Sequence, residues 1–258
     1  MVSLLITATL LAQSALIGQE PQALVADNKN QSASVVPEPP KPTLTPEVRA
    51  DIAMARKDYR QAIELYKSVM GRNPTLMNKV GIAYHQLMEM DQAKKYYEMS
   101  LKVNPNYPEA INNLGTVYYS AKNYRKAINQ YNKALKLTPN SASIYSNLGT
   151  AWFARRRYPQ ASEAYTKALE LDPEVFEHRS TNGVLLQERS VTERAKFHFY
   201  LSKTYAKAGQ NERALLYMRK ALEEGFKERN RFVDDPEFAS LQELPEFKEL
   251  LVSQPRVL

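Results

Sequence analysis

Three histidines are the side chains best suited to acid–base chemistry or metal binding near neutral pH, and they stand far apart in the sequence. His85, His178 and His198 each lack a second histidine at the spacing with which a helix holds a metal ion. The adjacent carboxylates Glu223–Glu224 and Asp234–Asp235 lie where helix ends and linkers are expected, so solvation accounts for them. We therefore predict no catalytic residue and no metal site.

Composition excludes several further classes of enzyme. The 258-residue chain has no Cys, which rules out thiol nucleophiles, cysteine-ligated zinc, iron–sulfur clusters and disulfides. It has only eight Gly, and it contains no phosphate-binding loop, no dinucleotide fingerprint and no G-x-S-x-G motif. With 43% hydrophobic and 24% charged residues, the composition is ordinary for a globular protein. A protein without catalytic activity and without a cofactor is expected.

The glycines indicate the elements that must position any functional side chain. Gly81, Gly115 and Gly149 are spaced 34 residues apart, and a fixed period of this size indicates an internal repeat. Apolar residues at steps of three and four predict two amphipathic helices in each repeat, which bury their apolar faces only when neighbouring repeats stack. The residues around Gly115 that carry the pattern are Ile111, Leu114, Tyr118, Ala127, Tyr131, Ala134 and Pro139.

The stretches NNLGTVYY and SNLGTAWF, followed by KALKLTP and KALELDP, resemble the tetratricopeptide repeat. The resemblance implies an all-α helical solenoid of about five helix-turn-helix repeats over residues 46–228, with weaker copies at 43–74 and 195–228. Pro74 lies seven residues before its glycine, against ten for the prolines of the next two copies. Three residues are therefore expected to be missing from the connector between repeats one and two.

Two segments depart from the repeat. An insertion at residues 174–193 displaces the fifth copy, and its Asn-Gly between Val175–Arg179 and Val184–Glu188 is typical of a β-hairpin, with an irregular loop as the alternative. Residues 229–258 contain Asp-Pro-Glu-Phe and Leu-Pro-Glu-Phe, each a typical helix start. Two short helices are predicted there, as a C-terminal cap over the last apolar face.

The N-terminal residues indicate the compartment. The uncharged stretch Leu4–Ile17 is too short to span a membrane but has the length of a signal-peptide core. We predict a signal peptide at residues 1–26, a Pro-rich linker at 27–45, an exported protein (periplasmic or secreted), and no membrane span in its mature form. Because no basic residue precedes Lys29, a cytoplasmic protein or one anchored by this segment remains the alternative.

Stacking of such repeats places the first helix of each on a concave surface. Side chains outside its core stripe are amides, hydroxyls and aromatic rings, which suit the backbone and apolar side chains of an extended peptide. We predict a scaffold that binds a protein or peptide in this groove, the plainer interpretation being a solvated helix face. The predicted groove residues are Asn78, His85, Asn112, Asn113, Thr116, Tyr119, Ser146, Asn147, Thr150, Phe153, Phe199 and Lys203.

The basic surplus supports a second hypothesis. Residues 46–258 hold 33 of the 35 basic and 25 of the 28 acidic residues, which gives this part a net charge of +8. The basic residues of two intra-repeat turns are predicted to form a ridge that binds an anionic polymer, lipid or nucleic acid, although export disfavours nucleic acid. An ordinary solvated edge is the plainer interpretation. The ridge residues are Lys122, Arg125, Arg155, Arg156 and Arg157.

Overall fold

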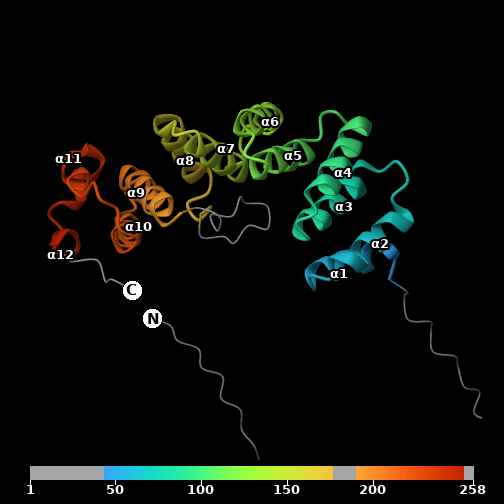
Figure 1. Cartoon of the computed structure of the whole chain (residues 1–258), viewed down its shortest axis with the longest axis horizontal. Helices are drawn as coiled ribbons and strands as arrows, with labels where there is room; N and C mark the ends of the chain where they lie inside the picture. Colours follow the sequence, from blue (N-terminus) through green and yellow to red (C-terminus); the bar gives the residue numbers. More distant parts are fainter. Residues whose placement is uncertain (1–43, 177–189, 253–258) are drawn as a thin grey trace, which may run out of the picture. The chain divides into compact units, whose positions relative to one another are not determined.

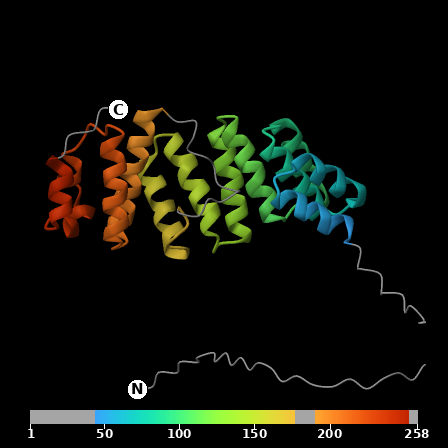
Figure 2. The ribbon, with the colours of Figure 1, turned by 90° about the horizontal axis from the view of Figure 1, so that it is seen from below.

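The computed structural model describes residues 44–176 and 190–252, which belong to one compact unit, Thr43–Leu258. In these ranges five antiparallel helix pairs follow one another along the chain, as Figures 1 and 2 show. The predicted all-α solenoid is confirmed. The first helices are α1 (Pro46–Ala55), α3 (Pro74–Gln86), α5 (Pro108–Ser120), α7 (Ala142–Ala154) and α9 (Val191–Lys207). The second helices are α2 (Tyr59–Val69), α4 (Met90–Val103), α6 (Tyr124–Leu137), α8 (Tyr158–Leu171) and α10 (Asn211–Glu223).

In the second, third and fourth pairs, the two helices cross where a glycine faces a fully buried tyrosine. A Cβ atom built on Gly149 would lie 2.5 Å from two ring carbons of Tyr165. Gly81 and Gly115 meet their tyrosines in the same way. The 34-residue spacing of the glycines therefore reflects this close approach, in which the tyrosine ring takes the space that a side chain would need.

The turn inside each pair has the same backbone geometry. Its middle residue adopts positive φ, as at Met88 (φ 61°) and Gly209 (φ 72°). The amides of Met88 and Glu89 bond back to the carbonyls of His85 and Tyr84, each at 2.9 Å, which satisfies the end of the first helix. Because every pair turns in this way, equivalent turn residues lie at the same edge of the array. The other positive-φ residues in these turns are Lys57, Lys122 and Arg156.

The turn geometry predicts opposite effects for two substitutions. Met88→Gly should stabilise the protein by up to about 1 kcal/mol. Removing a side chain from a residue at positive φ relieves about 1–2 kcal/mol of strain, and the greater conformational entropy that glycine gives the unfolded chain offsets part of this gain. Gly209→Ala should destabilise it by a similar amount; its Cβ meets nothing within 4 Å, so only backbone strain acts. Urea unfolding of both variants checks the pair, and a shift of the same sign in both would contradict it.

The three residues missing from the first repeat are not missing from the connector, so that prediction is wrong. Helices α2 and α4 end at Val69 and Val103, 34 residues apart, and the connectors that follow have equal lengths. Instead, α2 has 11 residues where α4 has 14. The three missing residues amount to nearly one helical turn, so the buried face of α2 keeps its orientation toward the neighbouring helices.

The insertion lies mostly outside the described residues. Residues 177–189 hold most of the predicted hairpin, which stays a prediction, while Val175 and Phe176 form a turn. The ring of Phe176 packs edge-on against Tyr165 and Tyr205, at 5.4 and 6.2 Å between centroids. Helix α9 begins at Val191 behind the capping hydroxyl of Ser190, so the fifth pair starts within the predicted insertion.

The C-terminal cap contains three short helical segments in its described part, where two were predicted. These are α11 (Arg231–Asp234), the 3-10 helix η2 (Pro236–Leu241) and α12 (Pro245–Val252). Helix η2 packs on α9, and α12 packs on α10. The buried rings of Phe232, Phe238 and Phe247 fill the contact, so the cap covers the apolar end of the fifth pair.

Candidate functional site

Successive first helices are joined by side-chain bonds at equivalent positions. Asn113 Nδ2 donates to Asn78 Oδ1 at 3.1 Å, and one repeat further Asn147 Nδ2 donates to Asn112 Oδ1 at the same distance. Asn112 Nδ2 also lies 3.4 Å from Asn113 Oδ1, which connects the two bonds. We call these four residues the amide chain; it runs across α3, α5 and α7.

We call the contact between successive first helices a junction. At the first junction, between α1 and α3, an ion pair replaces the amides. Lys79 Nζ lies 3.1 Å from Glu47 Oε1, the two residues standing where the asparagines stand in later repeats. Lys79 Nζ also lies 2.8 Å from Asp51 Oδ1, and Asp51 accepts a further hydrogen bond from Tyr66. Burial raises the pKa of Asp51, but these two donors outweigh it and bring the pKa below its usual value. Sequence analysis missed this cluster, although the repeat alignment places Lys79 in the column of Asn113 and Asn147.

The amide chain is buried, with 2–6% of each residue exposed. Buried amides must find partners, and mutual bonding supplies them across two junctions. An asparagine amide has two N–H donors, and the chain bonds use one each from Asn112, Asn113 and Asn147. The chain thus holds the repeats in register and retains hydrogen-bonding capacity beyond its internal bonds.

The two predicted threonines, Thr116 and Thr150, form hydrogen bonds with core residues. Thr116 Oγ1 accepts the hydroxyl of Tyr131 at 3.3 Å and lies at the same distance from the Asn112 carbonyl. Thr150 repeats both contacts with Tyr165 and Ser146. Burial raises the pKa of Tyr131, which keeps its hydroxyl a donor at any ordinary pH.

Two predicted groove residues, Phe153 and Phe199, lie in the core instead of outside it. Phe153 is 5% exposed and meets the rings of Phe197 and Tyr200 edge-on at 5.5 and 5.9 Å. Tyr200 stands where Asn113 and Asn147 stand in earlier repeats, so aromatic rings fill the fourth junction in place of an amide bond. Phe199 is fully buried and stacks on Phe226, with 4.4 Å between centroids, beneath the cap.

Lys203 is held by the cap. Its Nζ lies 2.9 Å from Asp235 Oδ2 and 3.1 Å from Glu237 Oε2, and the side chain is 18% exposed. Burial lowers the pKa of Lys203, but the two carboxylates outweigh it and raise the pKa above its usual value. The candidate surface therefore ends before α9, because the cap covers that helix.

Besides Lys203, three predicted groove residues keep part of their side chains exposed. His85, Tyr119 and Ser146 are half-buried on the first helices, and the ring of Tyr119 packs against Tyr124 at 5.2 Å. We call these three residues the rim. The candidate surface consists of the rim on α3, α5 and α7, and the amide chain lies buried beneath it.

Burial lowers the pKa of His85 below its usual value, because the charged imidazolium loses solvation. The unfolded chain then binds more protons than the folded protein near pH 6, so stability falls as the pH drops through about 6.5. We expect His85→Gln to reduce the loss of thermal midpoint between about pH 7.5 and about pH 5.5. An identical loss in both proteins would show that His85 does not titrate differently on folding.

The predicted ridge residues lie in two turns and at the start of α6. Lys122, Arg125, Arg156 and Arg157 are exposed, while Arg155 lies over the ring of Trp152 at 5.6 Å. Lys126, which the repeat phase also places beside Lys122 and Arg125, has its Nζ 5.5 Å from the centre of the Tyr118 ring.

The described ranges hold neither a metal-binding cluster nor a membrane-spanning helix. Residues 44–176 and 190–252 contain no cluster of three or more histidine and carboxylate side chains that could hold a metal ion. In the same ranges no helix combines the length and apolarity needed to cross a bilayer.

Sequence profiles of repeat families match three stretches of the chain. A TPR repeat profile matches residues 116–154, and tetratricopeptide repeat profiles match residues 74–107 and 142–175. A comparison with curated proteins gives no match.

Solved structures with a similar arrangement of helices include two of MamA. A crystal structure of MamA has 21% sequence identity, covers 68% of this chain and 93% of its own, and has a TM-score of 0.48. MamA 41-end from Desulfovibrio magneticus RS-1 has 22% identity, covers 69% and 92%, and has a TM-score of 0.49.

Proposed function

Because the chain is a tetratricopeptide-repeat protein, we propose that it is a non-catalytic scaffold that binds an extended segment of a partner protein along α3, α5 and α7. The rim carries the proposal, because His85, Tyr119 and Ser146 keep part of their side chains exposed on three consecutive first helices. The amide chain lies buried beneath the rim and holds these helices in register. An extended peptide presents hydrogen-bonding groups at a regular rise of about 3.3 Å per residue, which polar side chains on successive helices can meet.

The rim supplies the contacts that select side chains. Tyr119 gives apolar area with a hydroxyl at its end, and His85 and Ser146 add short polar groups on either side of it. Phe153, Phe199 and Lys203 take no part, because the core and the cap hold them. The proposed surface is therefore shorter than the sequence predicts and covers repeats two to four.

The test uses peptides selected against the full-length protein from a random library. Ser146→Arg fills the rim, and we expect it to weaken binding of the selected peptides by about tenfold, since a bulky side chain there excludes the peptide backbone from the first-helix surface. Asn132→Arg is the matched control: Asn132 is exposed on α6, the second helix of the third pair. Isothermal calorimetry measures both.

Equal binding by the wild type, Ser146→Arg and Asn132→Arg would refute the first-helix surface. A photoreactive group placed in the bound peptide gives a second readout. Crosslinks to α3, α5 or α7 support the proposal, and crosslinks confined to the second helices contradict it.

We also propose that the scaffold acts after export. The uncharged segment Leu4–Ile17, with small residues after it, supports removal of residues 1–26. N-terminal sequencing of the protein recovered from its own cell tests this. A first residue between positions 15 and 27 is expected, and an intact N-terminus in the cytoplasmic fraction would contradict it.

A further inference from the structure

The positive charge of this protein is concentrated in one stretch of the chain. Residues 110–162 contain no Asp or Glu, yet they contain eight basic residues. The net charge of the whole chain is +7, so this stretch accounts for more than the total. The basic residues are Lys122, Arg125, Lys126, Lys133, Lys136, Arg155, Arg156 and Arg157.

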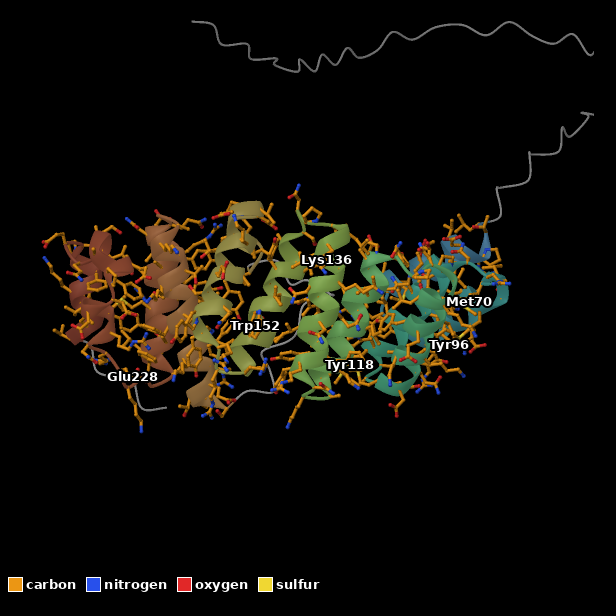
Figure 3. All side chains as sticks on the ribbon, turned by 90° about the horizontal axis from the view of Figure 1, so that it is seen from above. Met70, Tyr96, Tyr118, Lys136, Trp152 and Glu228 are labelled. Atoms are coloured by element: carbon orange, nitrogen blue, oxygen red, sulfur yellow. The ribbon has the colours of Figure 1, made fainter. Side chains whose placement is uncertain are left out.

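Six of these eight residues gather at one edge of two adjacent repeats. The turns after α5 and α7 share their backbone geometry: the amides of Lys122 and Arg156 each bond to the carbonyl three residues back, at 2.8 Å. Helices α5 and α7 pack on each other, so these turns are neighbours. We call Lys122, Arg125, Lys126, Arg155, Arg156 and Arg157 the turn patch. Lys136, near the other end of α6, lies toward the opposite edge from Tyr118 (Figure 3).

The turn patch is bounded by acidic residues. Equivalent positions of the second repeat hold Glu89 and Asp91, and Glu89 forms an ion pair with Arg60. On the other side, the fifth repeat has Gln210 at the position of Arg157, and Glu212 follows it. The uncompensated charge is therefore two repeats wide.

The folded structure does not need this charge. In the described part of the chain, none of the six patch cations has a carboxylate within ion-pair distance, whereas Lys79, Arg194, Lys203 and Arg231 each do. Like charges at one edge repel each other, which costs stability unless a partner of opposite charge binds there. Packing does not require it either, since Lys122, Arg125, Arg156 and Arg157 are exposed.

The aromatic rings beside the patch are already covered. Tyr118 has the amines of Lys94 and Lys126 over it, at 5.8 and 5.5 Å from the centroid, and Arg155 lies over Trp152. Single-stranded nucleic acid is gripped by stacking bases on open ring faces, which these rings do not offer. A membrane surface is held by exposed apolar side chains, and large exposed hydrophobic residues are absent from residues 118–126 and 152–157.

We propose that the turn patch binds an acidic segment of a protein partner, a run of Asp and Glu side chains lying across the turns of repeats three and four. Arginine is suited to this, because its guanidinium forks match carboxylate oxygens in pairs. Tyr118 and Trp152 hold Lys126 and Arg155 in place by cation–π contact, so less entropy is lost on binding. This site lies at the turn edge and is independent of the first-helix surface.

The experiment measures binding of a fluorescent oligoglutamate peptide to the full chain by anisotropy, over a range of salt concentrations. The patch variant carries Arg125→Glu, Arg156→Glu and Arg157→Glu. It leaves Lys126 and Arg155, which lie over aromatic rings, unchanged. The control variant carries Lys102→Glu, Lys133→Glu and Lys136→Glu, three exposed lysines on the outer faces of α4 and α6. Both variants change the net charge equally.

Oligoglutamate should bind the wild type with an affinity that falls as salt rises, and the patch variant should lose about tenfold or more. The control variant should lose less than about threefold, since its changes alter only the long-range field. Circular dichroism of the patch variant shows whether its helices are retained. If they are not, Arg156→Glu alone provides the same comparison, because Arg156 is exposed and lies in a turn.

Equal losses in the patch and control variants would overturn the proposal, because net charge alone would then explain binding. Vesicles containing phosphatidylglycerol and a single-stranded oligouridine are the competing probes. Tighter binding of either than of oligoglutamate, lost in the patch variant, would assign the patch to a membrane or to RNA and refute the acidic segment. Ser146→Arg should leave oligoglutamate binding unchanged, so failure of the first-helix surface and failure of the turn patch are separate results.

Discussion

Gly149→Ala is expected to lower the free energy of unfolding by about 2 kcal/mol, because overpacking costs about 3 kcal/mol and the better helix propensity of alanine returns about 1 kcal/mol. The added Cβ would lie 2.5 Å from two ring carbons of Tyr165 and 3.2 Å from the Ala161 carbonyl oxygen. Tyr165 is fully buried, so its ring has no open space to move into. Chemical unfolding followed by circular dichroism measures the loss.

The fifth repeat provides the control for this prediction. There Ser202 stands in the place of Gly149 and Met218 in the place of Tyr165, and both are fully buried. The fifth repeat thus combines a side chain at the glycine position with a methionine, which is narrower than the tyrosine of the other repeats. The double variant Gly149→Ala with Tyr165→Met should be more stable than the sum of the two single changes predicts. Strict additivity would show that the ring and the new methyl group do not collide.

The first repeat accepts a methyl group at the glycine position. Ala50 occupies the glycine position and Tyr66 is retained. Helix α1 is the first helix of the array; it packs against α2 and is joined to α3 by the ion pairs of Lys79. Helix α7, in contrast, lies between α6 and α8 and also meets α5. A helix at the end of the array can shift to accept a methyl group, so the expected cost applies to the inner repeats.

Phe199→Ala is expected to destabilise the protein by about 3–5 kcal/mol, the usual cost of removing a fully buried phenylalanine. The ring of Phe199 stacks on Phe226 and meets Phe232 edge-on at 5.0 Å, so its loss opens a cavity between α9 and the cap. We also expect limited proteolysis to cut within the cap at lower protease concentration. Thermal unfolding measures the stability loss.

Leu216→Ala is the matched control, since Leu216 is 42% exposed on α10 and should change stability by less than about 0.5 kcal/mol. A Phe199→Ala protein that keeps its stability but loses peptide binding would contradict the structure. That result would return Phe199 to the binding surface that sequence analysis predicts.

The regular part of the fold was predictable because its causes are local and repeated. The glycine–tyrosine crossing recurs every 34 residues, so comparison of the copies reveals both helices and their contact. The shortened α2 was misplaced for a physical reason. Pro74 begins α3 as Pro108 begins α5, and it was compared with Pro105, which lies in the connector after α4. Prolines before and after a connector look alike in sequence.

The candidate site was less predictable, because burial depends on contacts between repeats. Asn112 and Asn147 were recognised as polar positions of the first helices, yet their bond to each other depends on the packing of α5 against α7. Phe199 was misassigned because the cap that covers it comes more than 30 residues later in the sequence. No periodic pattern connects the cap to α9.

The fourth junction has a mechanical consequence. Each of the first three junctions is fastened by a directional bond between first helices, namely Lys79 to Glu47, Asn113 to Asn78 and Asn147 to Asn112. Between α7 and α9 the contact consists of aromatic rings, such as Phe153 and Tyr200. Rings can slide over one another at little cost, whereas a hydrogen bond breaks when its atoms separate. Under a pulling force, the array should therefore yield first between its fourth and fifth repeats, and the stiff segment should comprise repeats one to four.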